Sequence, residues 1–528
     1  MADACPPTAS RAPPSWAERA FGLDTRSLAA FRAAVGAIVA ADATLRTRDL
    51  ALLFAPQGAI PPDVLRAWQG DPCCWSLATL VDAAWCGPAV LLLEGAAGVA
   101  LTAGWHTRWA TVAAWLAVVS VLRRTAPATN AGDAWLACLL FWGMFLPLGA
   151  AWSWDARRPA ARIAATDREG ASPTPTRAAG GLPATVRATV IGPPTVALVL
   201  QIAVVYVAAG LAKCNDSWLS GDAIRFAVSV HDHGTPLGER LLGTGPLTRP
   251  LSWGLVALEL AGPLLLIARP GLRGPLAAAF VTFHAVSCLT LSIGLFGYVG
   301  MAAWMPLLPS GTWGRGAAGP PPVLAWGRSW PVTVACLAAG AVSVASLAHD
   351  LGPARERPEP APLRQLANLG CLQQRWRMFG TVERQDQWAY ARAELADGRV
   401  VDLLRGGRPL EAERPSGGFT SLPHHRWHKL LWNLPRPEHR VFAAPLTAAL
   451  AEDWNRRHPA TARVVAVELR FARRGRTADD DTLHELLLAA WPPRSPAGRG
   501  NLDRLLDAGG DDATARAAAA RGTTVDWP

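Results

Sequence analysis

Residues 195–213, TVALVLQIAVVYVAAGLAK, decide the fold class of this chain because they form an almost uninterrupted apolar run that ends at a lysine. A helix needs about 20 mainly apolar residues to cross the roughly 30 Å hydrocarbon core of a bilayer. The run therefore predicts a transmembrane helix ending at Lys213. The polar segment CNDSWLSGD, residues 214–222, follows directly and marks the predicted boundary of the membrane.

Similar apolar stretches recur through the first 350 residues and predict a polytopic helical membrane protein. The 528-residue chain is 51% hydrophobic and 17% charged, with a mean hydropathy of +0.17, as expected for a membrane protein with a soluble portion. Many of its 24 tryptophans flank the apolar stretches, and indole rings prefer the bilayer interface. The nine predicted spans are 27–45, 82–103, 109–122, 133–151, 195–213, 251–268, 275–291, 293–309 and 330–349. Eight result if the seventh and eighth are continuous across Ser292–Gly294.

The charges of the chain bear on its orientation and its partners. No secretory signal opens the chain, so the first span itself is expected to direct insertion. With nine spans, Lys and Arg are more frequent in loops on the side of the N-terminus, which predicts a cell-membrane protein with a cytoplasmic N-terminus and an extracytoplasmic C-terminal domain. A count of eight spans would reverse the side of the C-terminal domain. Arginines in short loops explain much of the +10 net charge, so we predict the lipid bilayer, and not a nucleic acid, as a partner.

The first span carries two ionisable residues, Arg32 and Asp42. Such residues in a span normally face protein or water, so this helix is expected to pack inside the bundle. The two lie about 15 Å apart along a helix axis, which is too far for them to pair.

A change of composition after Ala348 predicts a separate C-terminal domain. The linker DLGPARERPEPAP, residues 350–362, is charged and rich in proline, as domain boundaries often are. The predicted units are an N-terminal tail (1–22), a transmembrane domain (23–313), a final transmembrane helix with its flanks (314–352), a soluble α+β or β-rich domain (353–473) and a loosely ordered tail (474–528).

Within the soluble domain, hydrophobic periodicity predicts individual elements. Residues 387–404, QWAYARAELADGRVVDLL, read as a β-hairpin around the turn ADG, and 462–473, ARVVAVELRFAR, alternate like a strand. The stretches HHRWHKLLWNL (424–434) and PLTAALAEDWNRRH (445–458) predict helices. A short helix is predicted at LHELLLAAW, residues 483–491.

Lys213 is a candidate catalytic base. Only Lys213 and Lys429 are lysines among the 51 basic residues, so arginine serves wherever a plain positive charge is needed. An amine can lose its proton when it is desolvated, whereas a guanidinium stays charged. The alternative is an anchor that extends its amine toward the headgroups from a helix end.

Several histidine groupings favour structural roles over a metal site. His231 and His233 form an HxH pair that we interpret as part of a polar loop. In HHRWH, His424 and His428 share a helical face, but the glutamate of the zincin pattern is missing. The scattered cysteines form no recognisable ligand set. We therefore predict no metal site.

Five stretches, in this order, resemble the signatures of the HTTM family, a bacterial membrane domain related to vitamin K-dependent gamma-carboxylase. They are DTRSLAAFRAAVG (24–36), NAGDAWLACLLFWGMFLPLGAAWSWDA (130–156), VYVAAGLAKCNDSWLSGDA (205–223), LELAGPLLLI (258–267) and FHAVSCLTLSIGLFGYVGMAAW (283–304). The segment starting at RWRMFG (375–380) resembles the extension that follows the spans in many such proteins. Each motif is loose alone, but their shared order makes the resemblance specific.

The resemblance implies a chemistry. In the carboxylases, the lysine that matches Lys213 deprotonates reduced vitamin K, and the product of its reaction with oxygen removes a proton from a glutamate before CO2 adds. The resemblance thus implies a reduced quinone of the vitamin K type and a peptide substrate. His284 matches a carboxylase histidine, and it either lines the site or makes a structural hydrogen bond.

Asp133 marks a departure from the carboxylases, which carry a catalytic histidine there. We include Asp133 as a third candidate catalytic residue, although its place after Asn130 and Gly132 also suits a helix cap. The leading hypothesis is a carboxylase-like membrane enzyme. The alternative is a non-catalytic accessory protein in the maturation or export of a secreted peptide. The sequence leaves the oligomeric state open.

Overall fold

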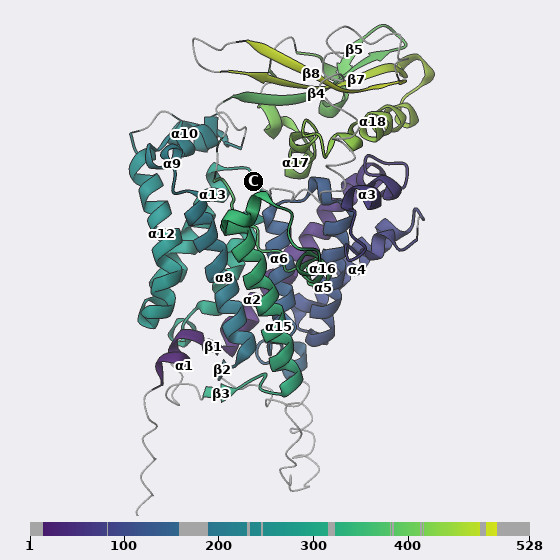
Figure 1. Ribbon diagram of the computed structural model, residues 1–528. Helices are drawn as coiled ribbons and strands as arrows, with labels where there is room; N and C mark the ends of the chain where they lie inside the picture. Colours follow the sequence, from purple (N-terminus) through teal and green to yellow (C-terminus); the bar gives the residue numbers. More distant parts are fainter. Residues whose placement is uncertain are drawn as a thin grey trace, which may run out of the picture.

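The computed structural model consists of a bundle of long helices with a five-stranded sheet at one end (Figure 1). It describes residues 14–493 apart from several gaps. These gaps are residues 82, 158–187, 230–232, 244–245, 315–322, 381, 383–384, 412–413, 416 and 476–481.

Six of the described helices are long and apolar enough to cross a membrane. They are Thr25–Phe54, which begins with α2 (Thr25–Arg46), α4 (Cys86–Ala103), α8 (Pro193–Ala212), α12 (Thr248–Ala268), Pro270–Thr290, which contains α13 (Arg273–Thr290), and α15 (Trp330–Leu351). The other predicted spans hold α5 (Thr107–Arg124), α6 (Ala131–Gly143) and α14 (Phe296–Trp304). The prediction of a multi-pass helical bundle is confirmed, whereas the count of eight or nine spans stays a prediction.

The seventh and eighth predicted spans are two separate helices, α13 and α14, which pack against each other. The chain leaves α13 at Leu291 in extended conformation and passes Gly294, whose φ of +62° lies in the left-handed region. A glycine adopts this conformation without the penalty that a Cβ atom would bring. Gly294 therefore permits the tight reversal between the two helices.

A small three-stranded sheet lies at the end of the bundle opposite the C-terminal domain (Figure 1). Its strands are β1 (Leu23–Asp24), β2 (Thr189–Ile191) and β3 (Val323–Ala325), with β1 antiparallel and β3 parallel to β2. Shorter helices complete the bundle and its loops. They are α1 (Trp16–Phe21), α3 (Pro62–Gln69), α9 (Asp216–Leu219), α10 (Asp222–Ser229), α11 (Pro236–Leu242) and α16 (Ala361–Gly370).

The C-terminal domain is an antiparallel sheet with strand order β6-β5-β4-β7-β8, and helices α17 and α18 lie between it and the bundle (Figure 1). Its elements are β4 (Asp386–Leu395), β5 (Val400–Asp402), β6 (Arg408–Pro409), α17 (His425–Asn433), α18 (Ala443–Arg457), β7 (Val464–Arg474) and β8 (Leu483–Trp491). The predicted hairpin is β4 with β5, and the two predicted helices are α17 and α18. These predictions, and that of strand β7, are confirmed.

The predicted short helix at residues 483–491 was wrong, because this segment is strand β8. Periodicity alone does not separate a short apolar run in a strand from one in a helix. Here the decision comes from outside the segment: β8 pairs along its length with β7, from Arg474↔Leu483 to Val467↔Trp491. The sheet therefore continues past residue 473, where the soluble domain was predicted to end.

The C-terminal domain shares a hydrophobic core with the end of the bundle. Phe54 and Val121, which belong to the bundle, lie in the same buried cluster as Leu430 of α17 and Phe471 of β7. Burial of apolar area stabilises this contact by about 25 cal/mol per Å². The junction thus fixes α17 against the ends of the membrane helices, and the candidate functional residues gather near it.

Candidate functional site

Lys213 lies at the C-terminal end of α8 with its amine buried, and the residue is only 3% exposed. Its Nζ lies 2.9 Å from Oε2 and 3.2 Å from Oε1 of Glu259 on α12, which is 4% exposed. The amine therefore does not extend outward from the helix end, as in the alternative of an anchor toward the headgroups. It is half of an ion pair between two helices.

Aromatic and polar residues close this ion pair from the side of the C-terminal domain. The ring of Trp218 lies 5.3 Å from the Lys213 Nζ, within reach of a cation–π interaction. The Trp218 indole donates to the Phe379 carbonyl at 2.7 Å, and Asn215 donates to the Gly380 carbonyl at 2.7 Å. The segment RWRMFG, residues 375–380, thus packs against the end of α8 through the carbonyls of its last two residues.

His284 is fully buried on α13 and belongs to a chain of hydrogen bonds. The Trp304 indole donates to the Tyr206 hydroxyl at 2.7 Å, and this hydroxyl lies 2.7 Å from His284 Nε2. Since the hydroxyl accepts from the indole, its own proton is available for the imidazole. Gly300 lies so close to the ring that a Cβ atom there would collide with it. The structural hydrogen bond, one of the two alternatives for His284, is observed.

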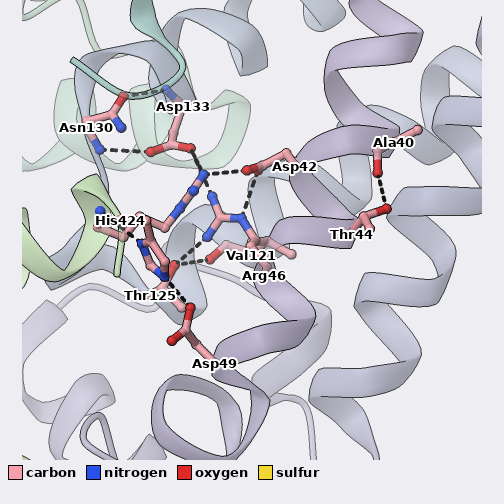
Figure 2. Close-up of polar contacts among 11 residues, drawn as sticks. Ala40, Asp42, Thr44, Arg46, Asp49, Val121, Thr125, Asn130, Asp133 and His424 are labelled. Atoms are coloured by element: carbon pink, nitrogen blue, oxygen red, sulfur yellow. Dashed lines mark hydrogen bonds and ion pairs between the residues drawn. The ribbon is translucent and has the colours of Figure 1, made fainter. Parts of the chain in front are cut away.

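Asp133 has both carboxylate oxygens occupied at the start of α6, as Figure 2 shows. Its Oδ2 accepts from the backbone amide of Asn130 at 2.8 Å, while the Asn130 side chain accepts from the amides of residues 132 and 133. Asn130 is therefore the N-cap, and Asp133 completes a capping box. Its Oδ1 lies 2.9 Å from Arg46 and 3.0 Å from Arg426.

Two arginines and two aspartates form a buried charge cluster at the junction (Figure 2). Arg46 and Arg426 both contact Asp42 as well as Asp133, at 2.8 Å and 2.5 Å for the Asp42 oxygens. We name these four residues the arginine cluster. Because Arg426 comes from α17 and the other three come from α2 and α6, the arginine cluster joins the C-terminal domain to the bundle.

Arg32 and Asp42 do not pair, as their separation predicted. Arg32 donates to the Trp152 carbonyl at 2.7 Å, on the opposite part of α2 from Asp42. The sequence did indicate a protein-facing Asp42, and the i, i+4 spacing of Asp42 and Arg46 was a further sign of a pair on one helix face. No pattern in the sequence pointed to Arg426 as their partner.

The structure does not bring Lys213, His284 and Asp133 into one contact set. Among the described residues, no hydrogen bond or ion pair joins any two of them. Tyr206 and Lys213 share helix α8, seven residues and about 10 Å apart along its axis. Trp135 of α6 contacts the rings of both Tyr206 and His284. Packing therefore connects the three, without direct polar contact.

A group of histidines lies beside the arginine cluster, on α17 and in the loop before α11. His424 is the N-cap of α17 and pairs with Asp49, so it lies just before the helix whose face it was predicted to share with His428. Residue 231 of the HxH pair lies outside the described residues, but His233 lies with its ring centroid 4.4 Å from that of His428. The ring centroid of His425, on the same turn of α17, lies 5.5 Å from that of His428.

Burial also perturbs the titration of two residues on α17. Desolvation, with the nearby positive charges of Lys429 and Arg426, lowers the pKa of His425 to about 3. Desolvation, with the charge of Arg436, lowers the pKa of Lys429 to about 7. Both lysines of this chain are thus buried, one in the bundle and one at the junction.

Residues 185–313 match the family model of the HTTM domain. The chain contains an HTTM domain. The match begins just before strand β2 and ends at Trp313, past the end of α14, so it includes Lys213, Glu259 and His284. The first two motifs of the resemblance, with Asp133, precede it. No curated protein and no solved structure matches the chain.

The HTTM domain and the six apolar helices make this an integral, multi-pass membrane protein. The helices that carry the HTTM domain are also those that hold the Lys213–Glu259 pair and the Tyr206–His284 hydrogen bond. The arginine cluster lies outside the matched region and attaches the C-terminal domain.

Proposed function

We propose that this HTTM protein is a carboxylase-like membrane enzyme in which Lys213 accepts a proton from a reduced quinone. The observation that carries the proposal is the buried Lys213–Glu259 pair at the end of an apolar helix. Ionisable residues buried within a bundle of membrane helices are costly and are usually retained for function. The resemblance to the gamma-carboxylases assigns the base to this same position.

Glu259 gives the lysine a route to its neutral form. With Glu259 Oε2 2.9 Å from Nζ, a proton can pass from the ammonium to the carboxylate within the existing contact. The neutral amine can then accept a proton from a quinol hydroxyl, which an arginine at this position cannot do. Leu211, two residues before Lys213 on α8, is half exposed, so this end of the helix also presents an apolar side chain on its outer surface. As the resemblance implies, the reaction of the reduced quinone with oxygen would supply the strong base that removes a proton from a glutamate of the peptide.

The second candidate is a non-catalytic accessory protein for the maturation or export of a secreted peptide. The contacts of Asp133 and His284 favour it. Helix capping and the arginines account for both oxygens of Asp133, and packing with Tyr206 accounts for His284. In this reading the Lys213–Glu259 pair only joins α8 to α12.

We also propose the orientation that the charged loops predict, with the N-terminus in the cytoplasm and the C-terminal domain outside. Strand β1, close to the N-terminus, and the C-terminal sheet lie at opposite ends of the bundle (Figure 1). This placement supports an odd number of crossings.

The test uses full-length protein in lipid nanodiscs with vitamin K hydroquinone, oxygen and a glutamate-containing peptide, and measures quinone epoxide by mass spectrometry. We expect wild-type protein to form epoxide and Lys213→Arg to lose about 10²–10⁴-fold in rate, the usual contribution of a general base. Arg225→Lys, an exposed charge-conserving exchange at the same end of the bundle, is the control and keeps the rate.

Each result decides between the candidates. Failure of wild-type protein to form epoxide contradicts the enzyme proposal and leaves the accessory role. Epoxide formation by Lys213→Arg at the wild-type rate shows that another group is the base. Unfolding curves of both variants distinguish a lower catalytic rate from a loss of folded protein.

A further inference from the structure

Three histidines from two distant segments converge at the junction between the bundle and the C-terminal domain. His233 lies in the loop before α11, while His425 and His428 lie three residues apart on α17 and share one helix face. One ring nitrogen from each lies within 4.8 Å of the others. Neither the HTTM chemistry nor the arginine cluster uses these imidazoles.

The spacing suits a metal ion after a small adjustment. A tetrahedral zinc ion binds imidazole nitrogens at about 2.0–2.1 Å, which places the nitrogens roughly 3.3 Å apart. Rotations of the side chains can supply the difference from the observed upper limit of 4.8 Å. Three histidines with an open fourth position are the ligand set of many catalytic zinc sites.

The surroundings hold the three rings in place. The Phe419 ring stacks on His428 at a centroid distance of 4.3 Å and an interplanar angle of 12°. The backbone carbonyl of His233 accepts from the Ser292 amide at 2.5 Å, which ties its loop to the end of α13. Rings oriented by neighbouring groups lose less freedom when they bind an ion.

The charges around the cluster also bear on a cation. Arg426 lies on the same helix, but Asp42 and Asp133 compensate its charge. His425 Nδ1 is buried and has no hydrogen-bond partner among the described residues, a state that is costly unless something else satisfies it. Lys429, whose positive charge acts on His425, is a further basic residue near the cluster.

We propose that His233, His425 and His428 bind a divalent transition-metal ion of the zinc class, with a fourth position open to water or a substrate. The site departs from the sequence-based prediction of no metal site. Sequence spacing could not reveal it, because the pairing of residue 233 with residues 425 and 428 depends on how the C-terminal domain docks. The ion would fasten α17 to the loop before α11, in addition to the arginine cluster.

The test uses tag-free, full-length protein in detergent, stripped with a chelator, dialysed and titrated with ZnCl2 in competition with a fluorescent zinc indicator. We expect one zinc ion per chain. We expect His425→Gln and His428→Gln each to weaken binding at least about 10-fold, because even the loss of a group that orients a metal ligand typically costs about 10–100-fold in affinity. His106→Gln, at an exposed histidine outside the cluster, is the matched control and binds like wild type.

Metal-free unfolding curves show whether each variant is folded before zinc is added. Since a ligand that binds only the folded state raises its stability, zinc should raise the Tm of the wild type and of His106→Gln but not that of His428→Gln. Cobalt substitution should give visible bands of the intensity typical of tetrahedral sites. The proposal is overturned if His425→Gln and His428→Gln bind zinc as tightly as the control His106→Gln, or if the wild type binds no zinc.

Discussion

Two sets of buried charges hold this protein together, and they differ in the cation that they use. The bundle contains a lysine–glutamate pair, in which Lys213 contacts both oxygens of Glu259. The junction contains the arginine cluster, in which each guanidinium contacts two carboxylates. Both sets balance their charges, and both lie at the end of the bundle that faces the C-terminal domain.

The difference shows which of the two sets contains a cation that is chemically able to give up its proton. A guanidinium offers five donors in a fixed plane, suits several acceptors at once and does not give up its proton in proteins. The arginine cluster is therefore a fixed connection between domains. An amine has a compact charge and can exchange a proton with the carboxylate beside it. Among 49 arginines and two lysines, one of the lysines, Lys213, lies beside a carboxylate with which an amine can exchange a proton.

The largest effect should come from Arg426→Met, which breaks the arginine cluster. The change leaves Asp42 and Asp133 with one arginine between them, and removing one partner of a buried ion pair typically costs about 3–5 kcal/mol. Thermal unfolding in detergent should show a lower Tm. Limited proteolysis should cut the linker at residues 350–362 faster, because α17 loses its attachment.

Arg440→Met is the matched control, because Arg440 is exposed and the change of charge is the same. It should leave both the Tm and the proteolysis rate close to wild type. If Arg426→Met behaved like this control, the arginine cluster would not be what joins the two domains.

The next effect concerns the Lys213–Glu259 pair and takes the form of a double-mutant cycle. Lys213→Met and Glu259→Met should each destabilise the protein by about 3 kcal/mol, because each leaves one uncompensated charge in an apolar setting. The double variant should recover most of this loss, since well-packed apolar residues often replace a buried pair without cost. Unfolding in detergent measures all three.

Recovery of stability in the double variant would show that folding does not need the pair. This is the result expected of a pair that is retained for its chemistry. Purely additive losses, with no recovery, would instead mean that the two charges do not interact and that the pairing is wrong.

The sequence predicted some elements of the fold correctly and missed others. The apolar run before Lys213 predicted α8 almost to the residue, because a bilayer demands a continuous apolar length. The alternation in residues 462–473 predicted β7, because one face of a sheet is buried. Strand β8 was missed, since its apolar run has no clear period and its conformation depends on pairing with β7. A local sequence pattern therefore predicted an element only where the bilayer or a buried sheet face requires that pattern.

The candidate site shows the same limit. Lys213, Asp133 and His284 were found through motifs, yet their partners Glu259, Arg426 and Tyr206 come from other elements. Glu259 and Tyr206 stand within the quoted motifs, but spacing in one chain gives no pairing between helices. Arg426 lies in HHRWH, outside the five motifs of the family resemblance. Its position follows from the docking of α17, which only the assembled core of the junction determines.

The smallest effect should come from Glu94→Gln, which sharpens the contrast between occupied and unoccupied carboxyl groups. Glu94 is buried on α4, within electrostatic reach of Arg46, but its Oε2 has no hydrogen-bond partner among the described residues. An amide at this position breaks no ion pair of the arginine cluster, so the free energy of unfolding should change by less than about 1 kcal/mol. Asp133→Asn, the same exchange at an occupied carboxylate, removes a charge that two arginines contact and should cost several times more. Unfolding curves of the two variants compare them directly, and an equal loss in both would mean that Glu94 is a fifth member of the arginine cluster.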